Sequence, residues 1–496
     1  MKTPQSLFAR YLTVLLITLF SLSPAWATCG GGGGGGGGGM SGGSSSGTGS
    51  AAETYPVPWK VRDAKTPPAK GLVVYWFPAS KEEMNKSSLR MSRTLSLYAS
   101  QCVSMELADG HMPNADKLVG EAKPPLAVIA EPDGTPVSRI ENNQGKLKVE
   151  AVEKVLDTEV KTRSSALDAQ LKDAKAKLDA GDKDAAIKLY QGVAEQKCMF
   201  PGKAKSAAKE LKKLGVPDVA GLIDSPSFPL PVFAAKQSAR IELTMKRGLI
   251  EENAGRYVAA EKLYQSAHSM DPADPTPLRY LGELYRHHLG NWEKARTTFG
   301  EILNMPADRL SRAVALHGLG KMTIHDGEFL KGLHLMEQSV DEYPLALAYR
   351  NLSVYWNSEG DLVKAGEYTQ KALSLDPKDP YNLVFAAVFM AASGKREEAL
   401  KIAQANINLL PASYNLAAIY ALNGQRDQAL ALLKRHFYQF ERYHEVRSKE
   451  MMEARVDAVF DTLRKDSDFL ALTRFADGRL KMPMKGEPAT QAGQNQ

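Results

Sequence analysis

The sequence predicts a mainly helical protein, in which an α-solenoid of helix-turn-helix repeats follows a small α/β domain. The first observation is a glycine that recurs every 30 to 37 residues in the second half of the chain. The second is a small residue five positions after each of these glycines. The third is a short β-branched and aromatic run at 71–77, which is typical of a buried strand.

The repeated glycines mark the turn between two helices of one unit. They are Gly255, Gly290, Gly327, Gly360, Gly394 and Gly424. Glycine adopts left-handed backbone conformations at little cost, so it suits a helix end. In the first unit Ala260 allows the two helices to approach, Tyr264 fills the space between them, and Pro272 ends the second helix. One such pair cannot bury its apolar face alone, so neighbouring pairs must stack.

These marks, with a period near 34 residues, resemble the tetratricopeptide-repeat family over residues 237–440. The resemblance implies a curved array whose first helices line a concave groove. An isolated copy at 163–215, with Gly181, Ala186 and Tyr190, predicts a separate helical hairpin. We expect a proline-rich linker at 216–236, capping helices at 441–478 and a disordered tail at 479–496.

Residues 65–162 alternate strands and helices. We expect strands at 71–77, 102–107, 126–130 and 137–140, with helices at 87–100 and 148–158. This order resembles a thioredoxin-like fold, and the resemblance implies that Pro125 is the family's cis-proline. The redox motif of that family would follow the first strand, but Phe77-Pro78-Ala79-Ser80-Lys81 contains no cysteine. The fold is therefore expected without disulfide-exchange chemistry, which requires a thiolate.

The N-terminus has the order of a secretory signal. Basic Lys2 and Arg10 precede an apolar run at 11–22, and Ala25-Trp26-Ala27 provides small residues for cleavage. We expect a signal peptide at 1–27 and a Gly/Ser-rich flexible tether at 28–55. A retained membrane anchor is the alternative.

Cys29 resembles the acylated first residue of bacterial lipoproteins, although Trp26-Ala27-Thr28 is a poor lipobox. Two cleavages therefore compete, one after Ala27 and one before Cys29. Either one predicts a periplasmic protein. If Cys29 is acylated, Gly30 favours attachment to the outer membrane, because it is not the aspartate that retains lipoproteins at the inner membrane.

Composition argues against several function classes. The net charge is +6, and basic and acidic residues are interspersed, so we expect no nucleic-acid partner. No phosphate loop, nucleophile elbow or zinc spacing is visible, and we expect no catalytic residue, cofactor or metal site. Cys102 and Cys198 are either a disulfide or two buried small side chains.

Aligning the repeats places a set of polar residues on the expected concave face. They are Arg279, Glu283, Arg286, His287, His317, Lys321, His325, Arg350 and Asn357. The cations among them would pair with carboxylates of a partner. The alternative is that they form only the solvated face of a solenoid.

The sequence therefore predicts a non-catalytic scaffold of the cell envelope that binds a protein or peptide in its groove, with membrane contact only through an N-terminal lipid. One alternative is a periplasmic thiol-disulfide oxidoreductase or chaperone-like protein of the thioredoxin type. Another is a factor that assembles with copies of itself.

Overall fold

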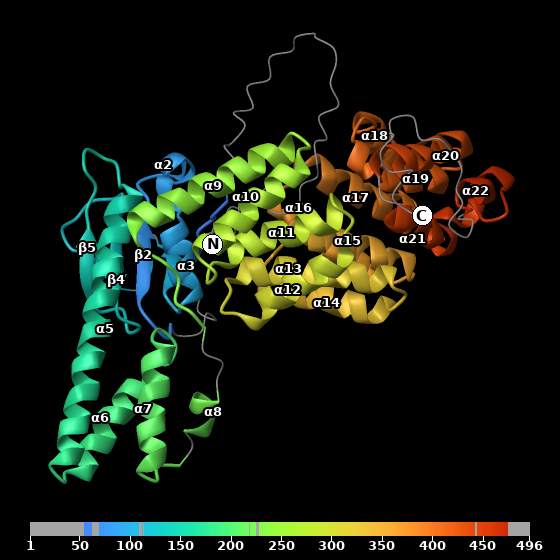
Figure 1. Cartoon of the computed structure of the whole chain (residues 1–496). Helices are drawn as coiled ribbons and strands as arrows, with labels where there is room; N and C mark the ends of the chain where they lie inside the picture. The colour runs from blue at the N-terminus through green and yellow to red at the C-terminus, as the bar shows by residue number, and fades with distance from the viewer. Residues whose placement is uncertain are drawn as a thin grey trace, which may run out of the picture.

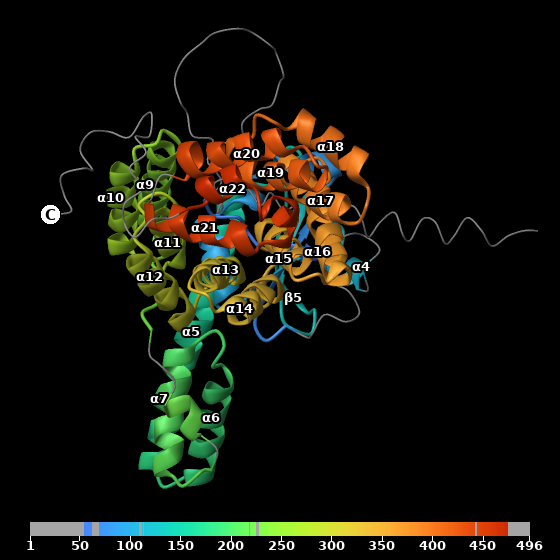
Figure 2. The ribbon, with the colours of Figure 1, turned by 90° about the vertical axis from the view of Figure 1, so that its right-hand side faces the viewer.

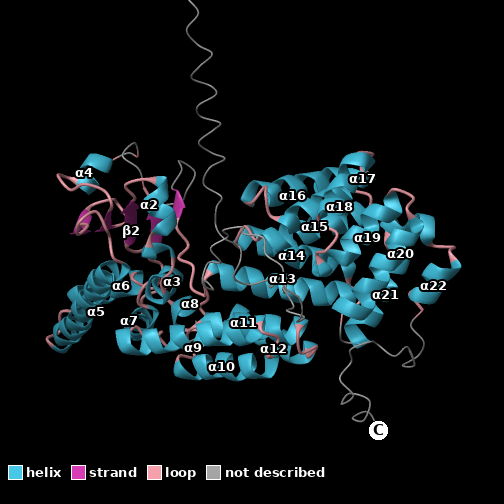
Figure 3. Cartoon of the chain, turned by 90° about the horizontal axis from the view of Figure 1, so that it is seen from above, coloured by secondary structure: helices cyan, strands magenta, loops and turns pink. Residues whose placement is uncertain are grey.

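The computed structural model describes residues 54–61, 69–108, 112, 114–217, 219–224, 228–441 and 444–474. The chain is mainly helical, with one sheet at one end of the molecule and an array of helix pairs at the other (Figures 1 and 3). The expected signal peptide, Cys29, most of the expected tether and the expected tail lie outside the described residues.

The sheet has five strands in the order β1-β3-β2-β4-β5. Strand β2 pairs with β3 in parallel and with β4 in antiparallel orientation, and β4 pairs with β5 as a hairpin. The strands are β1 (Lys60–Val61), β2 (Val73–Phe77), β3 (Ser104–Leu107), β4 (Leu126–Ala130) and β5 (Pro136–Ile140). The central strands β2 and β4 are buried along their whole length, so the sheet is covered on both faces.

Short helices connect these strands: α2 (Lys81–Lys86), the 3₁₀ turn η1 (Ser88–Arg90), α3 (Arg93–Ser100) and α4 (Ala115–Val119). The helix expected at 87–100 is thus interrupted. Ser92 has extended backbone angles and accepts a hydrogen bond from the Leu95 amide, so it begins a new helix as its N-cap. The peptide bond between Pro124 and Pro125 is cis.

Helix α5 (Val149–Asp179) joins the sheet to the helical hairpin. Its first half packs Val152 and Leu156 on the sheet, and its second half packs Leu167 and Ala174 against α6 (Lys183–Glu195) and α7 (Pro201–Lys213). A single helix therefore crosses the boundary expected between residues 162 and 163. The segment lacks glycine and proline and is rich in Lys, Ala, Leu and Asp, so nothing ends the helix there.

Cys102 and Cys198 form a disulfide with a Cα–Cα distance of 5.8 Å. Cys102 lies between α3 and β3, and Cys198 lies between α6 and α7. The bond therefore ties the hairpin to the sheet region. Among the described residues between the hairpin and residue 235, only the short α8 (Ala220–Ile223) is helical.

Six helix pairs form the array. They are α9 (Ala235–Asn253) and α10 (Tyr257–Met270), α11 (Pro275–His287) and α12 (Trp292–Asn304), α13 (Arg309–His325) and α14 (Phe329–Glu342), α15 (Ala346–Ser358) and α16 (Leu362–Leu375), α17 (Pro380–Ala392) and α18 (Arg396–Ala405), and α19 (Ser413–Leu422) and α20 (Arg426–Arg435). All six predicted turn glycines have positive φ, as does Gly181 of the hairpin.

Close packing within a pair follows the predicted small residues. Ala260, Ala295, Ala365 and Ala399 are all fully buried. In the third pair the position is Gly332, where an added Cβ would lie 2.4 Å from a side-chain carbon of Ile324. The helices of this pair therefore approach more closely than an alanine would allow.

Within the array, η2 (Leu410–Ala412) precedes α19. After the array, the chain forms the π-helical turn η3 (His436–Phe440), α21 (His444–Val456), η4 (Ala458–Leu463) and α22 (Ser467–Leu472). The segment from η4 to α22 buries Phe460 and Phe469 at the end of the array. Helix α21 adds Met451 and Ala454 to the same buried cluster. It also contacts α13, and Figure 2 shows it near the label of that helix.

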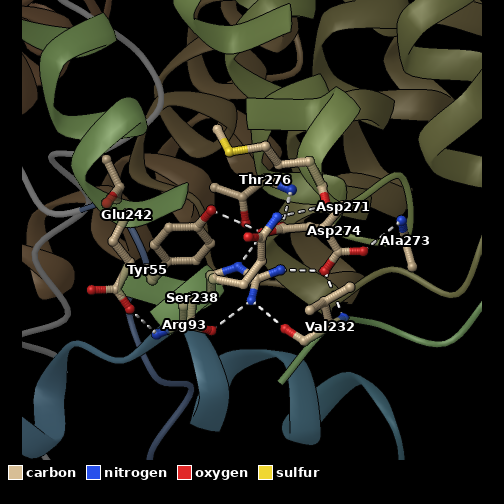
Figure 4. A network of polar contacts seen from close by, with 12 residues as sticks. Tyr55, Arg93, Val232, Ser238, Glu242, Asp271, Ala273, Asp274 and Thr276 are labelled. Carbon is tan, nitrogen blue, oxygen red and sulfur yellow. Dashed lines mark hydrogen bonds and ion pairs between the residues drawn. The ribbon is translucent and has the colours of Figure 1, made fainter. Parts of the chain in front are cut away.

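The sheet region docks on the first repeats through a buried charge network around Arg93 (Figure 4). The guanidinium donates to Asp274 at 2.9 Å, to the Val232 carbonyl at 2.6 Å, to Ser238 at 2.7 Å and to Asp271. Arg93 and Asp274 are fully buried. Because each hydrogen bond joins α3 to residues near α9, α10 or α11, the network fixes the two regions to each other.

Residues 54 and 55 were expected at the end of the flexible tether at 28–55. In the structure they belong to this interface. The Tyr55 hydroxyl donates to Asp274 at 2.8 Å, and Thr54 and Tyr55 are both buried. This hydrogen bond helps to hold the segment in the interface, because a buried tyrosine hydroxyl needs a partner.

Candidate functional site

A cavity of about 180 Å³ lies on the concave side of the array. Residues from the first helices of five successive repeats, α11, α13, α15, α17 and α19, line one side of it. The other side is formed by η3, by α21 and by Asp457 just after it. The array thus builds the groove that the repeats predict, and α21 of the same chain covers part of it.

Three cations of successive repeats line the array side of the cavity: Arg286 of α11, Lys321 of α13 and Arg350 of α15. Arg286 pairs with Glu283 at 2.8 Å. Lys321 donates to the Tyr355 hydroxyl at 2.5 Å and lies 5.0 Å from the centre of its ring.

Arg350 pairs with Asp379 at 3.2 Å and lies 5.6 Å from the ring centres of both Tyr381 and Phe385. Each cation is therefore held by its own repeat or the next one, so the array alone keeps the three charges in place without a ligand.

Three carboxylates of the C-terminal segment line the opposite side: Glu450, Glu453 and Asp457. Their spacing of three and four residues places them on one face of a helix. Glu450 accepts a hydrogen bond from His436 at 2.7 Å, and Glu453 lies 3.5 Å from His325. The cavity therefore separates a basic wall from an acidic wall.

Asp457, just after α21, accepts from Ser358 at 2.7 Å and from Tyr414 at 3.1 Å. It links the end of α21 to the fourth and sixth repeats. Its hydrogen-bond partners are neutral hydroxyl groups and not the basic residues of the groove.

The environment moves the pKa values of the two glutamates in opposite directions. Burial raises the pKa of Glu453 to about 7 against the opposing charge of Lys321, and the nearby carboxylates Glu450 and Asp457 add to the increase. Burial also disfavours the charged form of Glu450, but the charge and hydrogen bond of His436 lower its pKa to about 2. Strongly perturbed carboxyl groups in a cleft are typical of functional sites.

Two histidines of α13 flank the same cluster. Burial lowers the pKa of His317 and of His325 to about 3 each, and the nearby cations add to this effect. Both rings are therefore neutral at pH 7. Nε2 of His317 lies 2.8 Å from the Asn351 amide nitrogen, whereas its Nδ1 has no hydrogen-bond partner among the described residues.

Five of the nine predicted groove residues line the cavity: Arg286, His287, His317, Lys321 and Arg350. Most of these side chains are buried or half-buried, because α21 and the neighbouring repeats cover them.

The other four predicted residues lie outside the cavity. Arg279 is buried and donates to the Thr54 carbonyl at 3.1 Å, so it belongs to the interface with the N-terminal segment. Glu283 lies 2.8 Å from Arg286 and 3.3 Å from His287. His325 contacts Glu453 and Trp292, and Asn357 is buried within α15.

Sequence analysis missed the acidic wall, because residues 441–478 were expected only to cap the array. The spacing of Glu450, Glu453 and Asp457 is a signal that could have identified a charged helix face. Within the described residues, no cluster of His, Cys, Asp or Glu could hold a metal ion. In the same part of the chain, every helix is too short or too polar to span a bilayer.

Comparisons with known proteins agree on the repeats. Residues 253–319 match a family model described as tetratricopeptide repeat. Among curated proteins, the Protein CTR9 homolog of Arabidopsis thaliana is 25% identical over 236 residues, which is 38% of this chain and 21% of that protein. The chain thus spans about a fifth of the length of this relative.

Solved structures with similarity include the APC/C hetero-tetramer Cut9-Hcn1, with 16% identity, a TM-score of 0.33 and coverage of 79% of this chain and 82% of that one. PilF of Pseudomonas aeruginosa has 13% identity and a TM-score of 0.31, covering 44% of this chain and 99% of that one. From the helix pairs and the family match together, the chain contains tetratricopeptide repeats, with residues 253–319 as the matched segment.

Proposed function

We propose that the protein is a non-catalytic scaffold that binds a protein partner through the concave groove of its repeats. The observation that supports this most directly is the row of Arg286, Lys321 and Arg350 from three successive repeats beside one cavity. Cations at repeated positions offer a partner a line of charge-assisted hydrogen bonds. The lining also contains Tyr381 and Tyr414, and aromatic residues are enriched where proteins bind one another.

The proposal includes export to the bacterial cell envelope. Its support is the sequence at 1–27 and Cys29. The periplasm, with a lipid anchor in the outer membrane if Cys29 is acylated, is the proposed location. Fractionation of cells tests this: Cys29→Ser should release a membrane-bound chain, whereas a wild-type chain already in the periplasmic fraction contradicts the anchor.

We also propose that the region 65–162 has a thioredoxin-like fold that serves binding or placement and not redox exchange. The support is the strand order, with β2 between a parallel and an antiparallel neighbour. The cysteines of the described residues, Cys102 and Cys198, are bonded to each other. The purified chain should therefore not catalyse insulin reduction, and turnover in that assay would favour the oxidoreductase alternative.

The groove is tested with a partner identified by affinity capture from envelope extract and then purified. We expect the Lys321→Ala/Arg350→Ala variant to bind this partner at least tenfold more weakly at low salt. The loss should shrink as salt increases, because salt screens such charges over a Debye length of about 8 Å at physiological ionic strength.

The matched control is Lys331→Ala, which removes an exposed lysine of α14 outside the cavity. Circular dichroism must show unchanged helix content in both variants. Normal binding by the double variant would indicate that the partner binds the sheet region or the outer face of the array.

A further inference from the structure

Helix α21 is held in the groove largely by polar contacts. Lys449 donates to Asp326 at 2.6 Å and lies 4.5 Å from the ring centre of Trp292. Glu453 lies beside His325, and Asp457 after the helix bonds to Ser358 and Tyr414. These contacts reach helices from four different repeats, so α21 spans the groove as an extended ligand would.

The apolar contribution of α21 is small compared with that of the segment after it. Met451 and Ala454 are buried, whereas Met452 is 41% and Val456 is 73% exposed. In η4 and α22, by contrast, Phe460 and Phe469 are fully buried and close the end of the array. Met451 and Ala454 of α21 belong to the same buried cluster, but the large aromatic side chains Phe460 and Phe469 come from the segment after it, so α21 is available for a second role.

The charges of α21 complement those of the groove. Its acidic residues Glu450 and Glu453, with Asp457, line the same cavity as Arg286, Lys321 and Arg350. A partner that used these cations would have to occupy the volume that α21 now occupies. The face that α21 presents therefore indicates the kind of partner. We expect a helix with three carboxylates, in which the second and third follow the first by three and seven residues.

We infer that α21 is an internal ligand of the groove and that the partner is a protein segment presenting an acidic helical face of the same kind, which displaces α21 when it binds. This inference rests on the proposed binding function of the groove. The free groove would exist only in the fraction of molecules in which α21 has swung out, so the apparent affinity for the partner is lowered by that fraction.

The test uses a fluorescein-labelled peptide with the sequence of residues 444–457 and the chain with Cys29→Ser. Lys449→Ala removes the contacts with Asp326 and Trp292, which lie outside the cavity lining. We expect this variant to bind the peptide about three- to tenfold more tightly than wild type, as expected from losing one partly exposed ion pair and one cation–π contact. Lys331→Ala, which breaks an exposed pair with Glu328, should bind it as wild type does.

Hydrogen exchange measured on the same proteins reports the release of α21. Amides of residues 444–456 should exchange faster in Lys449→Ala, while those of α9 to α20 are unchanged. Faster exchange with no gain in peptide affinity would overturn the inference. Faster exchange with no peptide binding in any variant would instead contradict the proposed binding function, because an open groove would have failed to accept an acidic helix.

If hydrogen exchange of α21 is the same in Lys449→Ala and wild type, a cross-linked variant tests the inference. Ser358→Cys/Asp457→Cys replaces a pair of side chains that contact each other at 2.7 Å, and a short bis-maleimide can join them. The native cysteines 102 and 198 are protected as a disulfide. We expect the cross-linked chain not to bind the peptide that its uncross-linked form binds, and equal binding by both forms would overturn the inference.

Discussion

Two groups of buried charges lie along the array, and they differ in how completely their polar atoms are paired. Around Arg93, one guanidinium makes hydrogen bonds to two carboxylates, a carbonyl and a hydroxyl, and Asp271 and Asp274 accept further bonds from backbone amides (Figure 4). Around the groove cavity, Arg286 Nε and the Nδ1 atoms of His317 and His436 have no hydrogen-bond partner among the described residues.

The comparison teaches that buried charge by itself does not indicate a binding site. A fully paired network fixes two regions of a protein to each other, because any opening would leave a charge unpaired. A network with unpaired polar atoms next to a cavity can still gain hydrogen bonds, so it is the better candidate for binding. The groove also holds two glutamates whose pKa values are shifted in opposite directions.

The largest expected effect comes from breaking the Arg93 network. Arg93→Met leaves Asp271 and Asp274 buried without their cation, which should lower the free energy of unfolding by about 3–5 kcal/mol. Urea denaturation followed by tryptophan fluorescence measures this change. The control, Arg256→Met, removes an exposed pair with Glu251 and should leave stability unchanged within error. Equal losses in the two variants would mean that the network does not hold the interface.

A second, smaller effect on stability is expected from removing the disulfide. This bond constrains the sheet side of the molecule covalently, whereas the described residues of the groove side have no such bond. Cys102→Ser/Cys198→Ser should lower the free energy of unfolding by about 2–4 kcal/mol, because the bond closes a long loop in the unfolded chain. Dithiothreitol should reproduce the loss in wild type and add nothing to the double variant. Unchanged stability of reduced wild type would show that the helix packing of α5 to α7 alone fixes the hairpin.

The smallest effect is expected at Glu453, and it depends on pH. The pKa of Glu453 is raised from its ordinary value of 4.5 to about 7, so the folded state binds this proton more tightly than the unfolded state. Its contribution to stability is therefore lost as pH rises from about 4.5 through 7.

Glu453→Gln mimics the protonated group and should stabilise α21 by about 1–2 kcal/mol at pH 8 but not at pH 4, after allowance for the partial exposure of this side chain. Hydrogen exchange of residues 444–456 in both proteins at both pH values, corrected for intrinsic rates, measures this. Comparing Glu453→Gln with wild type at the same pH largely cancels the contribution that His317 makes to the pH dependence of stability. The exposed Glu328→Gln should show no such difference, and the same gain at pH 4 and pH 8 would contradict the raised pKa.

Much of the array could be predicted from residues that act within one repeat. Gly255 and its five successors take left-handed angles, and Ala260 and Ala295 are fully buried between the helices of their pairs. These features depend on contacts between residues a few positions apart or in the adjacent helix. The row of Arg286, Lys321 and Arg350 was predictable for the same reason, because equal positions in stacked repeats lie side by side.

The sequence by itself determined the local units: the turn glycines, the small residues between paired helices and the apolar strands. Only the tertiary structure decided that Arg279 serves the interface with Thr54, that Tyr55 joins the Arg93 network and that α21 lies in the groove. The physical reason is that the curvature of the array and the docking of distant segments depend on the sum of many small packing and charge terms. No single motif records that sum, so it becomes visible only when all the helices are in place.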